Sequence, residues 1–180
     1  MAFGSVDRKD ARVRLAAHVI PRLDGEGDIR IKGYVDRVDV DEETGRFVVF
    51  DYKTGVAPRA RDALDGRNFQ LAIYMDALSG QKGLSRPAGG VFYAVQHPTK
   101  VSRREPLARR DFTRDIKKSP PGVLDEEAFE RFREFTRDRV REVESHMRHG
   151  RFPVTSLTPE KAGCMTCDYR DICRVRPSRE

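Results

Sequence analysis

The chain has 180 residues, of which 36% are charged and 38% hydrophobic, and it contains no tryptophan. That length suits one domain with a core of its own. No apolar run approaches the roughly 20 residues of a membrane-spanning helix, and the N-terminus lacks a secretory signal pattern. These features exclude a membrane-spanning protein and predict a cytoplasmic one. The formal net charge of +6 favours a polyanionic partner.

The first half of the chain is rich in strand patterns. In residues 12–20, Val13, Leu15, Ala17 and Val19 alternate with mostly polar residues, which predicts a half-buried strand. Two further β-rich runs, 28–40 and 46–55, flank the acidic loop DEETG, which contains a glycine. Such a pair of runs around a short loop predicts a β-hairpin.

The second half alternates helices with one strand. Residues 66–80 predict a helix that ends near a glycine, residues 89–96 a strand, and residues 125–147 a long amphipathic helix capped by Asp125 and ended by Gly150. The strongly basic run 100–118 predicts an exposed loop. The order of strands, helix, strand and helix is typical of a mixed α/β domain. The expected apolar stripes are Phe69, Ile73 and Ala77 in the first helix and Phe129, Phe132, Val140, Val143 and Met147 in the second.

Asp51 and Lys53 lie at the end of the second hairpin run, in FDYKTG. Alternate residues of a strand share a face, so these two side chains stand side by side. If the hairpin turns near residues 43–44, opposed residues have indices that sum to about 87, which places Asp36 opposite Asp51 on the same face. Two carboxylates at that spacing repel each other unless a cation bridges them, and Mg²⁺ or Mn²⁺ suits oxygen ligands.

A lysine beside such an ion places positive charge where a phosphate or an attacking water would lie. The residues alone leave a second interpretation open, in which Asp36 pairs with Arg37 or Lys53 as ordinary surface electrostatics.

Three segments together carry a family resemblance: GYVDRVD at 33–39, FDYKTG at 50–55 and QLAIY at 70–74. They closely resemble the PD-(D/E)XK nuclease superfamily, in its RecB-like branch of helicase–nuclease domains and CRISPR adaptation nucleases. The resemblance implies a restriction-endonuclease-like α/β core, a mixed β-sheet flanked by helices. It also implies site roles: Asp36 and Asp51 as ligands of Mg²⁺ or Mn²⁺, Lys53 as the catalytic lysine, and Gln70 and Tyr74 as a Q-x-x-x-Y signature near the site.

Cys164, Cys167 and Cys173 form a C-x₂-C-x₅-C pattern, a spacing at which thiolates can converge on a soft metal or cluster. With the preceding GRFP, this block resembles the C-terminal part of RecB-type [4Fe–4S] nucleases. The resemblance implies that the three cysteines bind such a cluster together with a fourth cysteine far upstream. No upstream cysteine occurs here, so we expect an incomplete cluster. Free thiols, or zinc with His146 or His149 as fourth ligand, remain alternatives.

Two elements of the family pattern are missing from this chain: the fourth cysteine and an N-terminal helix that carries a metal-site histidine. His18 precedes Asp36 but lies in a predicted strand, so it receives no metal role. Both absences concern the N-terminal side. We therefore expect residues 1–180 to form a single nuclease domain that lacks its N-terminal helical segment, with residues 150–180 as a cysteine-bearing tail. The chain is then either a piece of a larger protein or a naturally reduced homologue.

Two functions are compatible with these residues. The first is a metal-dependent DNA nuclease, the exonuclease module of a helicase–nuclease in DNA repair or recombination, which acts on single-stranded DNA or duplex ends beside a helicase domain or subunit. The second is a catalytically incomplete nucleic-acid-binding or scaffolding module of the same fold, which the missing histidine and the basic run favour. For DNA contact we expect Arg59, Arg61 and Arg67, between the catalytic strand and the Gln70 helix.

Overall fold

The computed structural model describes residues 2–3, 14–97, 99–104, 106–112, 121–151 and 168. The chain divides into two units, residues 1–142 and 143–180. The sheet and the helices that pack on it belong to the first unit, and the long helix over 126–148 continues from the first unit into the second. None of the helices among the described residues combines the length and apolar character needed to span a bilayer. The elements in chain order are β1 (Ala2–Phe3), β2 (Arg14–Leu15), β3 (His18–Pro21), β4 (Asp28–Ile31), β5 (Gly33–Tyr34), β6 (Arg37–Val40), β7 (Arg46–Thr54), α1 (Ala60–Leu64), α2 (Gln70–Leu78), β8 (Arg86–His97), β9 (Lys100–Arg103), β10 (Leu107–Arg109), η1 (Arg110–Phe112), β11 (Val123–Leu124) and α3 (Glu126–Arg148).

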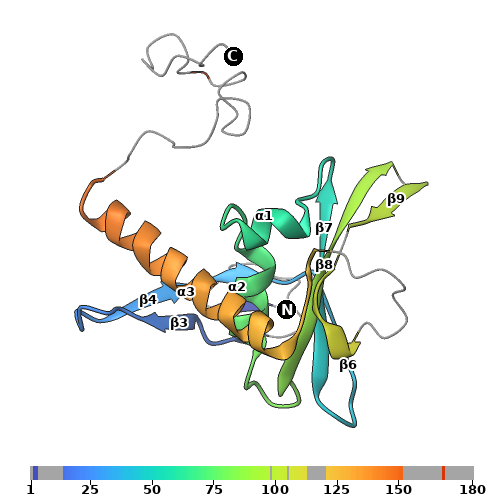
Figure 1. The fold of residues 1–180 in the computed structure, drawn as a ribbon, viewed down its shortest axis with the longest axis horizontal. Coiled ribbons are helices and arrows are strands. Elements are labelled where there is room, and N and C mark those ends of the chain that lie inside the picture. Colours follow the sequence, from blue (N-terminus) through green and yellow to red (C-terminus); the bar gives the residue numbers. More distant parts are fainter. Residues whose placement is uncertain are drawn as a thin grey trace. The chain divides into compact units, whose positions relative to one another are not determined.

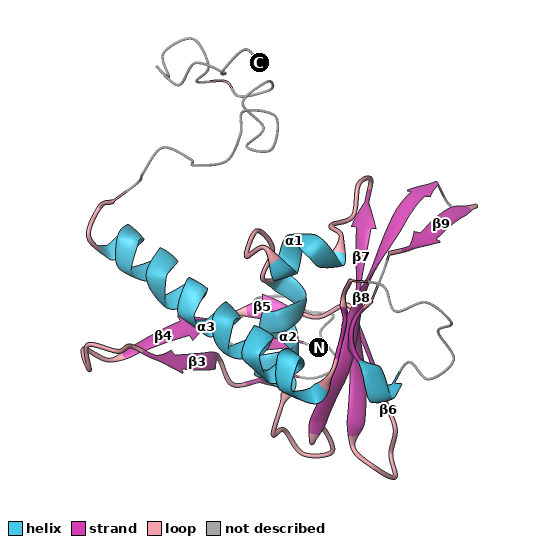
Figure 2. Cartoon of the chain, viewed as in Figure 1, coloured by secondary structure: helices cyan, strands magenta, loops and turns pink. Residues whose placement is uncertain are grey.

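The central sheet has the strand order β11-β10-β8-β7-β6, and β9 also pairs with β8. The sheet is mixed, because β7 and β8 run parallel whereas β6–β7 and β8–β9 are antiparallel. A parallel pair needs a crossover connection, which here contains α1 and α2. Figures 1 and 2 show α1 and α2 on the same side of the β7–β8 pair. The predicted mixed α/β fold is confirmed.

Helix α2 is the centre of the core rather than an amphipathic surface helix. Its expected stripe is wrong, because only Ala77 of the three stripe residues is buried. Close packing of α2 on the sheet depends on a glycine in β8: a Cβ atom at Gly90 would lie 3.0 Å from Val49 and 3.1 Å from Leu71. A helix buried on nearly all sides has no single stripe to read. The buried residues of α2 are Leu71, Ala72, Tyr74, Met75, Asp76, Ala77 and Leu78.

Two other expectations need correction. The single strand expected over 12–20 is two short strands among the described residues, and β3 buries Ile20 and leaves Val19 40% exposed. The face is set by pairing with β4, where Ile20 lies opposite the buried Ile29. The expected exposed loop at 100–118 contains β9, β10 and η1, and β10 is buried. Residues 113–118 lie outside the described residues.

Helix α3 begins and ends close to where the sequence predicts. Asp125 caps it by accepting a hydrogen bond from the Ala128 backbone N–H at 2.8 Å, and Gly150 follows its end with φ +64°. The stripe is right only in part: Phe129 and Phe132 are buried, but Met147 in the last turn is 62% exposed. Periodicity predicts which residues share a helix face, but it does not indicate how far along the helix that face is covered.

A buried acid joins α2 to α3. Asp76 accepts hydrogen bonds from Arg133 Nε at 2.6 Å and Arg137 Nε at 2.7 Å. The Asp76 side chain is almost fully buried, and that of Arg133 is largely so. Losing one member of such a group leaves the other charges without their partner, which costs far more than losing an exposed pair.

We predict that Asp76→Ala lowers the free energy of unfolding by about 3 kcal/mol, because Arg133 and Arg137 lose their shared carboxylate inside the helix contact. Urea denaturation measures this change. The matched control is Asp138→Ala, which removes an exposed carboxylate that pairs with Arg141 on α3 and should cost about 1 kcal/mol or less. Equal losses in both variants would contradict the structural role of Asp76.

Candidate active site

The register of the β6–β7 hairpin places the two predicted metal-binding acids. Each residue pair in it has indices that sum to 87, as in Arg37 opposite Phe50 and Val38 opposite Val49. The tight turn at 41–45 fixes this register: Gly45, with φ +67°, donates its N–H to the Asp41 carbonyl at 2.8 Å. Asp36 immediately precedes β6, so the same register sets it opposite Asp51. The predicted hairpin register is confirmed.

Asp36 is exposed and is held by the backbone of β7. Its Oδ2 accepts a hydrogen bond from the Tyr52 N–H at 2.9 Å. That N–H lies beyond the paired part of β6, so the carboxylate takes the place of a sheet hydrogen bond. Arg37 does not neutralise Asp36; it binds both carboxylate oxygens of Asp39 at 2.6 Å instead. The arrangement fixes one oxygen of Asp36 at the end of the hairpin.

Asp51 is a buried carboxylate with a cation beside it. The residue is 3% exposed, and its Oδ2 lies 2.6 Å from Lys53 Nζ. Burial raises the pKa of Asp51 above its ordinary value, since the charged form loses water. Lys53 opposes this shift by favouring the charged form, and the negative charge of Asp36 adds to it. Two carboxylates and one ammonium group therefore act on each other at this end of the sheet.

Gln70, the first residue of α2, connects these groups. Its Nε2 donates hydrogen bonds to Asp51 Oδ1 and to the Tyr74 hydroxyl, both at 2.8 Å. Its Oε1 accepts a hydrogen bond from Lys53 Nζ at 2.7 Å. Residues four apart on a helix lie on one face, which explains why Gln70 and Tyr74 meet. Burial also raises the pKa of Tyr74. One amide thus orients the acid, the lysine and the tyrosine together.

The carboxylate oxygens of Asp36 and Asp51 are ligands that suit a hard divalent cation. Asp51 Oδ2 is buried and has no hydrogen-bond donor in good geometry among the described residues, and the ammonium of Lys53 is its ionic neighbour. A buried oxygen in that state is available as a ligand. The described residues contain no group of three or more His, Cys, Asp or Glu side chains that could hold a metal. Mg²⁺ often needs only one or two carboxylates, because it keeps several waters or binds substrate phosphates.

The three predicted DNA-binding arginines differ in their surroundings. Arg59 is exposed at the start of α1 and makes no ion pair with a described residue. Arg61 lies 3.7 Å from Asp65. Arg67 is neutralised by Asp62 at 3.0 Å and by Asp65 at 2.8 Å. Of the three, Arg59 has the charge that is most available to a ligand.

Some predicted residues do not contribute to this site or lie outside the described residues. His18 is on β3, and the charges that act on it are Asp76, Arg137 and Arg133, the groups of the α2–α3 contact. Its pKa is lowered, chiefly by burial. His18 therefore lies among the groups of the α2–α3 contact. The cysteines Cys164, Cys167 and Cys173 lie outside the described residues.

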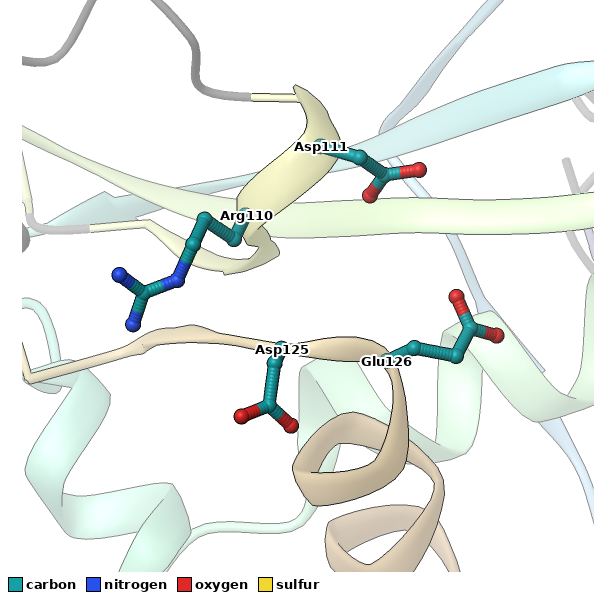
Figure 3. A pocket seen from close by; sticks show the side chains of 4 residues that line it. All are labelled: Arg110, Asp111, Asp125 and Glu126. Carbon is teal, nitrogen blue, oxygen red and sulfur yellow. The ribbon is translucent and has the colours of Figure 1, made fainter.

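Two features near the sheet have no sequence signal that predicts them. Phe92 on β8 lies opposite Asp51, and Lys53 Nζ is 5.6 Å from the centre of its ring. A separate cavity of about 410 Å³ lies where η1 meets the start of α3, and Figure 3 shows its lining side chains. None of the predicted site residues lines that cavity, so it is distinct from the Asp51 cluster. Its lining residues are Arg110, Asp111, Asp125 and Glu126.

Comparison with known proteins identifies the family. The sequence model of the PD-(D/E)XK nuclease superfamily matches residues 1–174. The chain belongs to this superfamily. Its mixed sheet flanked by helices is therefore a restriction-endonuclease-like core, as the sequence resemblance implies. Members of this superfamily generally use divalent metals.

A curated relative points to the RecB-like branch. This relative, an ATP-dependent helicase/deoxyribonuclease subunit from Caldanaerobacter subterraneus subsp. tengcongensis, is 27% identical over 195 residues. The match covers 82% of this chain but only 17% of the relative. The chain therefore corresponds to a small part of that longer protein.

We predict that Lys53→Met raises the pKa of Asp51 further, because Lys53 favours its charged form. Titration of the Asp51 carboxyl carbon by NMR measures this pKa directly.

A raised pKa of Asp51 also affects stability, because the folded state then binds a proton more readily than the unfolded chain does. The contribution of this group to the free energy of unfolding therefore falls as pH rises from 3.8 to the raised pKa. The variant should widen that pH window upward.

Arg37→Met is the control for this titration, since Arg37 pairs with Asp39 and does not act on Asp51. Its Asp51 midpoint should match that of the unaltered chain. An Asp51 midpoint that stays in place in Lys53→Met would show that the two groups do not interact as the structure has them.

Proposed function

We propose that this chain is a metal-dependent DNA nuclease that hydrolyses phosphodiester bonds. The observation that carries the proposal is the group of Asp51, Lys53 and Gln70, joined by contacts of 2.6 to 2.8 Å, with Asp36 held opposite Asp51 by the hairpin. Surface electrostatics does not require a buried carboxylate beside a lysine and a bridging amide. Perturbed ionisable groups that converge in this way are typical of catalytic sites.

Each residue has a role that its position supports. Asp36 and Asp51 would hold Mg²⁺ or Mn²⁺, which supplies Lewis-acid polarisation and a more acidic bound water. The Lys53 side chain is 30% exposed, which supports a role in contacting a phosphate oxygen or orienting the attacking water. Gln70 keeps Lys53 and Asp51 in place, and Tyr74 supports Gln70 from the next helical turn.

The biological setting is inferred from the curated relative. Its name joins an ATP-dependent helicase to a deoxyribonuclease, which supports DNA as the substrate and a helicase domain or subunit as the partner here. We therefore assign the chain to the exonuclease module of a helicase–nuclease in DNA repair or recombination. The three cysteines of the tail are assigned to a [4Fe–4S] cluster on their spacing and their resemblance to RecB-type nucleases.

One observation favours the catalytically incomplete alternative, a nucleic-acid-binding or scaffolding module. The described residues offer two carboxylates and no third metal-binding side chain beside them. The basic run 100–118 gives this alternative less support than its composition suggests, because Leu107, Ala108 and Arg109 within it are buried. Cleavage and binding assays on the same chain separate the two functions.

We predict that the chain degrades linear DNA with Mg²⁺ or Mn²⁺ and that Asp51→Ala abolishes the cleavage, because the buried ligand oxygen is lost. Gel assays on single-stranded and duplex substrates measure the rate. Asp39→Ala is the control, since Asp39 belongs to the same hairpin but is an exposed partner of Arg37. Persisting cleavage in Asp51→Ala would remove this residue from the site. Salt-dependent binding by the unaltered chain without cleavage would favour the scaffolding function.

We predict that Arg59→Gln weakens DNA binding more than Arg67→Gln does. Arg59 has no ion pair with a described residue, whereas Arg67 is neutralised by Asp62 and Asp65. Each lost phosphate contact should lower the slope of log K against log salt by roughly 0.7 to 0.9. Fluorescence anisotropy over a salt series gives both affinity and slope. A larger change in Arg67→Gln would reverse this ranking.

A further inference from the structure

The central sheet has a second face, turned away from helix α2. Gln70 of α2 donates a hydrogen bond to the Asp51 carboxylate at 2.8 Å, so Asp51 lies on the face that this helix covers. Figures 1 and 2 show α1 and α2 together on that side of the β7–β8 pair. Successive residues of a strand point to opposite faces. Tyr52 therefore points away from α2, and so does Tyr93, its partner on β8.

Two tyrosines and an arginine form a row on this second face, which we call the outer row. Tyr52 lies opposite Tyr93, and Tyr93 lies opposite Arg103 of β9. The rings of Tyr52 and Tyr93 are stacked, with centroids 5.6 Å apart and an angle of 28° between their planes. The ring of Phe50, 6.0 Å from that of Tyr93, packs beside this stack. The outer row therefore presents a supported aromatic surface with a cation at its β9 end.

The two ends of the outer row are accessible to a ligand. Tyr52 is 41% exposed. Arg103 is also exposed, and it makes no ion pair with a described residue. Phe50 is less available, because the Arg37 guanidinium lies 5.1 Å from its ring centre, and Arg37 is itself paired with Asp39. An exposed ring and an available cation thus lie on one row of the same face.

The outer row lies directly behind the candidate active site. Tyr52 is the residue between Asp51 and Lys53, and its N–H donates to the Asp36 carboxylate at 2.9 Å. The paired part of β6 ends before this position, so Tyr52 lies on a stretch of β7 that has no ladder partner in β6. Neighbouring strands of a sheet are spaced by about 4.8 Å. A DNA strand held at the two carboxylates is therefore one β-strand away from the Tyr52 ring.

We propose that the outer row is a stacking site for a base of single-stranded DNA, with Tyr52 as the exposed ring and Arg103 as a phosphate contact. The inference rests on the proposed function and deepens it by naming single-stranded DNA as the form of substrate that this chain binds.

Both the shape and the charge of this face suit such a strand. Every base has a flat π-face, so an exposed aromatic ring binds bases of any sequence while a nearby cation holds the backbone. The residues of β7, β8 and β9 include one acid, Asp51, and it lies on the other face. The outward side chains of these strands therefore do not repel phosphate, and Arg103 attracts it.

The test measures binding of two fluorescein-labelled single strands to the 180-residue chain. One probe is an oligothymidylate and the other is an abasic strand of the same length, so the two have equal charge and differ only in their bases. Anisotropy is recorded in EDTA, which prevents metal-dependent cleavage. The unaltered chain should bind the oligothymidylate at least about fivefold more tightly, because stacking contributes to that probe alone.

Tyr52→Ala should weaken binding of the oligothymidylate about fivefold or more and leave the abasic strand within about twofold. Tyr52→Phe should keep the preference for bases, since it keeps the ring. Both variants retain the backbone N–H that holds Asp36. The matched control is Phe135→Ala, which removes an aromatic side chain of similar exposure, 39%, from α3 and should leave both affinities unchanged.

Arg103→Gln tests the phosphate contact of the same row. Because a phosphate contact does not depend on the bases, this variant should weaken binding of both probes to the same extent. It should also lower the slope of log K against log salt by about 0.7, the value for one single-strand phosphate. A loss confined to the oligothymidylate, or an unchanged slope, would contradict this role of Arg103.

Thermal unfolding and sedimentation separate DNA stacking from other roles of Tyr52. A purely structural role would lower Tm in Tyr52→Ala and weaken both probes equally, and that result overturns the inference. An unchanged affinity for the oligothymidylate in Tyr52→Ala overturns it as well, as does an unaltered chain without a preference for bases. Self-association that Tyr52→Ala abolishes, with DNA binding unchanged, would instead make this face an interface between copies of the chain.

The proposed nuclease function fails separately from this inference. If the preference for bases depends on Tyr52 but the chain cleaves no DNA with Mg²⁺ or Mn²⁺, the nuclease proposal is overturned and the stacking site is supported. If the chain cleaves DNA while Tyr52→Ala binds both probes as the unaltered chain does, the stacking site is overturned and the nuclease proposal stands.

Discussion

The contact between Asp51 and Lys53 is the interaction on which the rest of the site depends. Folding removes the Asp51 carboxylate from water, and an ammonium group 2.6 Å away compensates its charge. Lys53 keeps part of its surface exposed, so the pair is buried on one side and open on the other. A carboxylate that folding has already removed from water is suited to bind a cation, because that part of the desolvation cost is already met.

The fold holds this pair at the end of a parallel strand. Because β7 and β8 are parallel, the chain between them crosses one face of the sheet and returns through α1 and α2. The crossover places Gln70, at the N-terminus of α2, beside the carboxyl end of β7. Gly90 allows α2 to approach the sheet closely enough for the amide to reach both Asp51 and Lys53. The position of the site therefore depends jointly on β7, on Gly90 and on the first residue of α2.

The sequence predicts the geometry of the candidate site better than it predicts which faces of the surrounding elements are buried. The hairpin register follows from the short acidic turn with Gly45, and that register alone sets Asp36 opposite Asp51. The Q-x-x-x-Y spacing predicts one helix face, and Gln70 and Tyr74 do meet there. These are local properties, determined by residues a few positions apart.

The expectations that fail depend on partners that are distant in the sequence. The predicted stripe of α2 fails because the sheet and other elements cover nearly all sides of the helix. The buried face of β3 differs from the predicted one because Ile20 lies opposite Ile29. A short stretch of sequence does not indicate which distant residues will pack against it.

Partners that are distant in the sequence also determine which charges of the chain are neutralised. A net charge of +6 treats all basic residues alike, but the structure divides the arginines by their partners. Arg67, Arg133 and Arg137 are neutralised by carboxylates of the fold, so their charges support helix contacts and add little to the field outside. Arg59, which makes no ion pair with a described residue, keeps its charge available outside the fold. The field that the fold presents to an anion therefore depends on how many of its cations lack acidic partners, rather than on how many cations the chain contains.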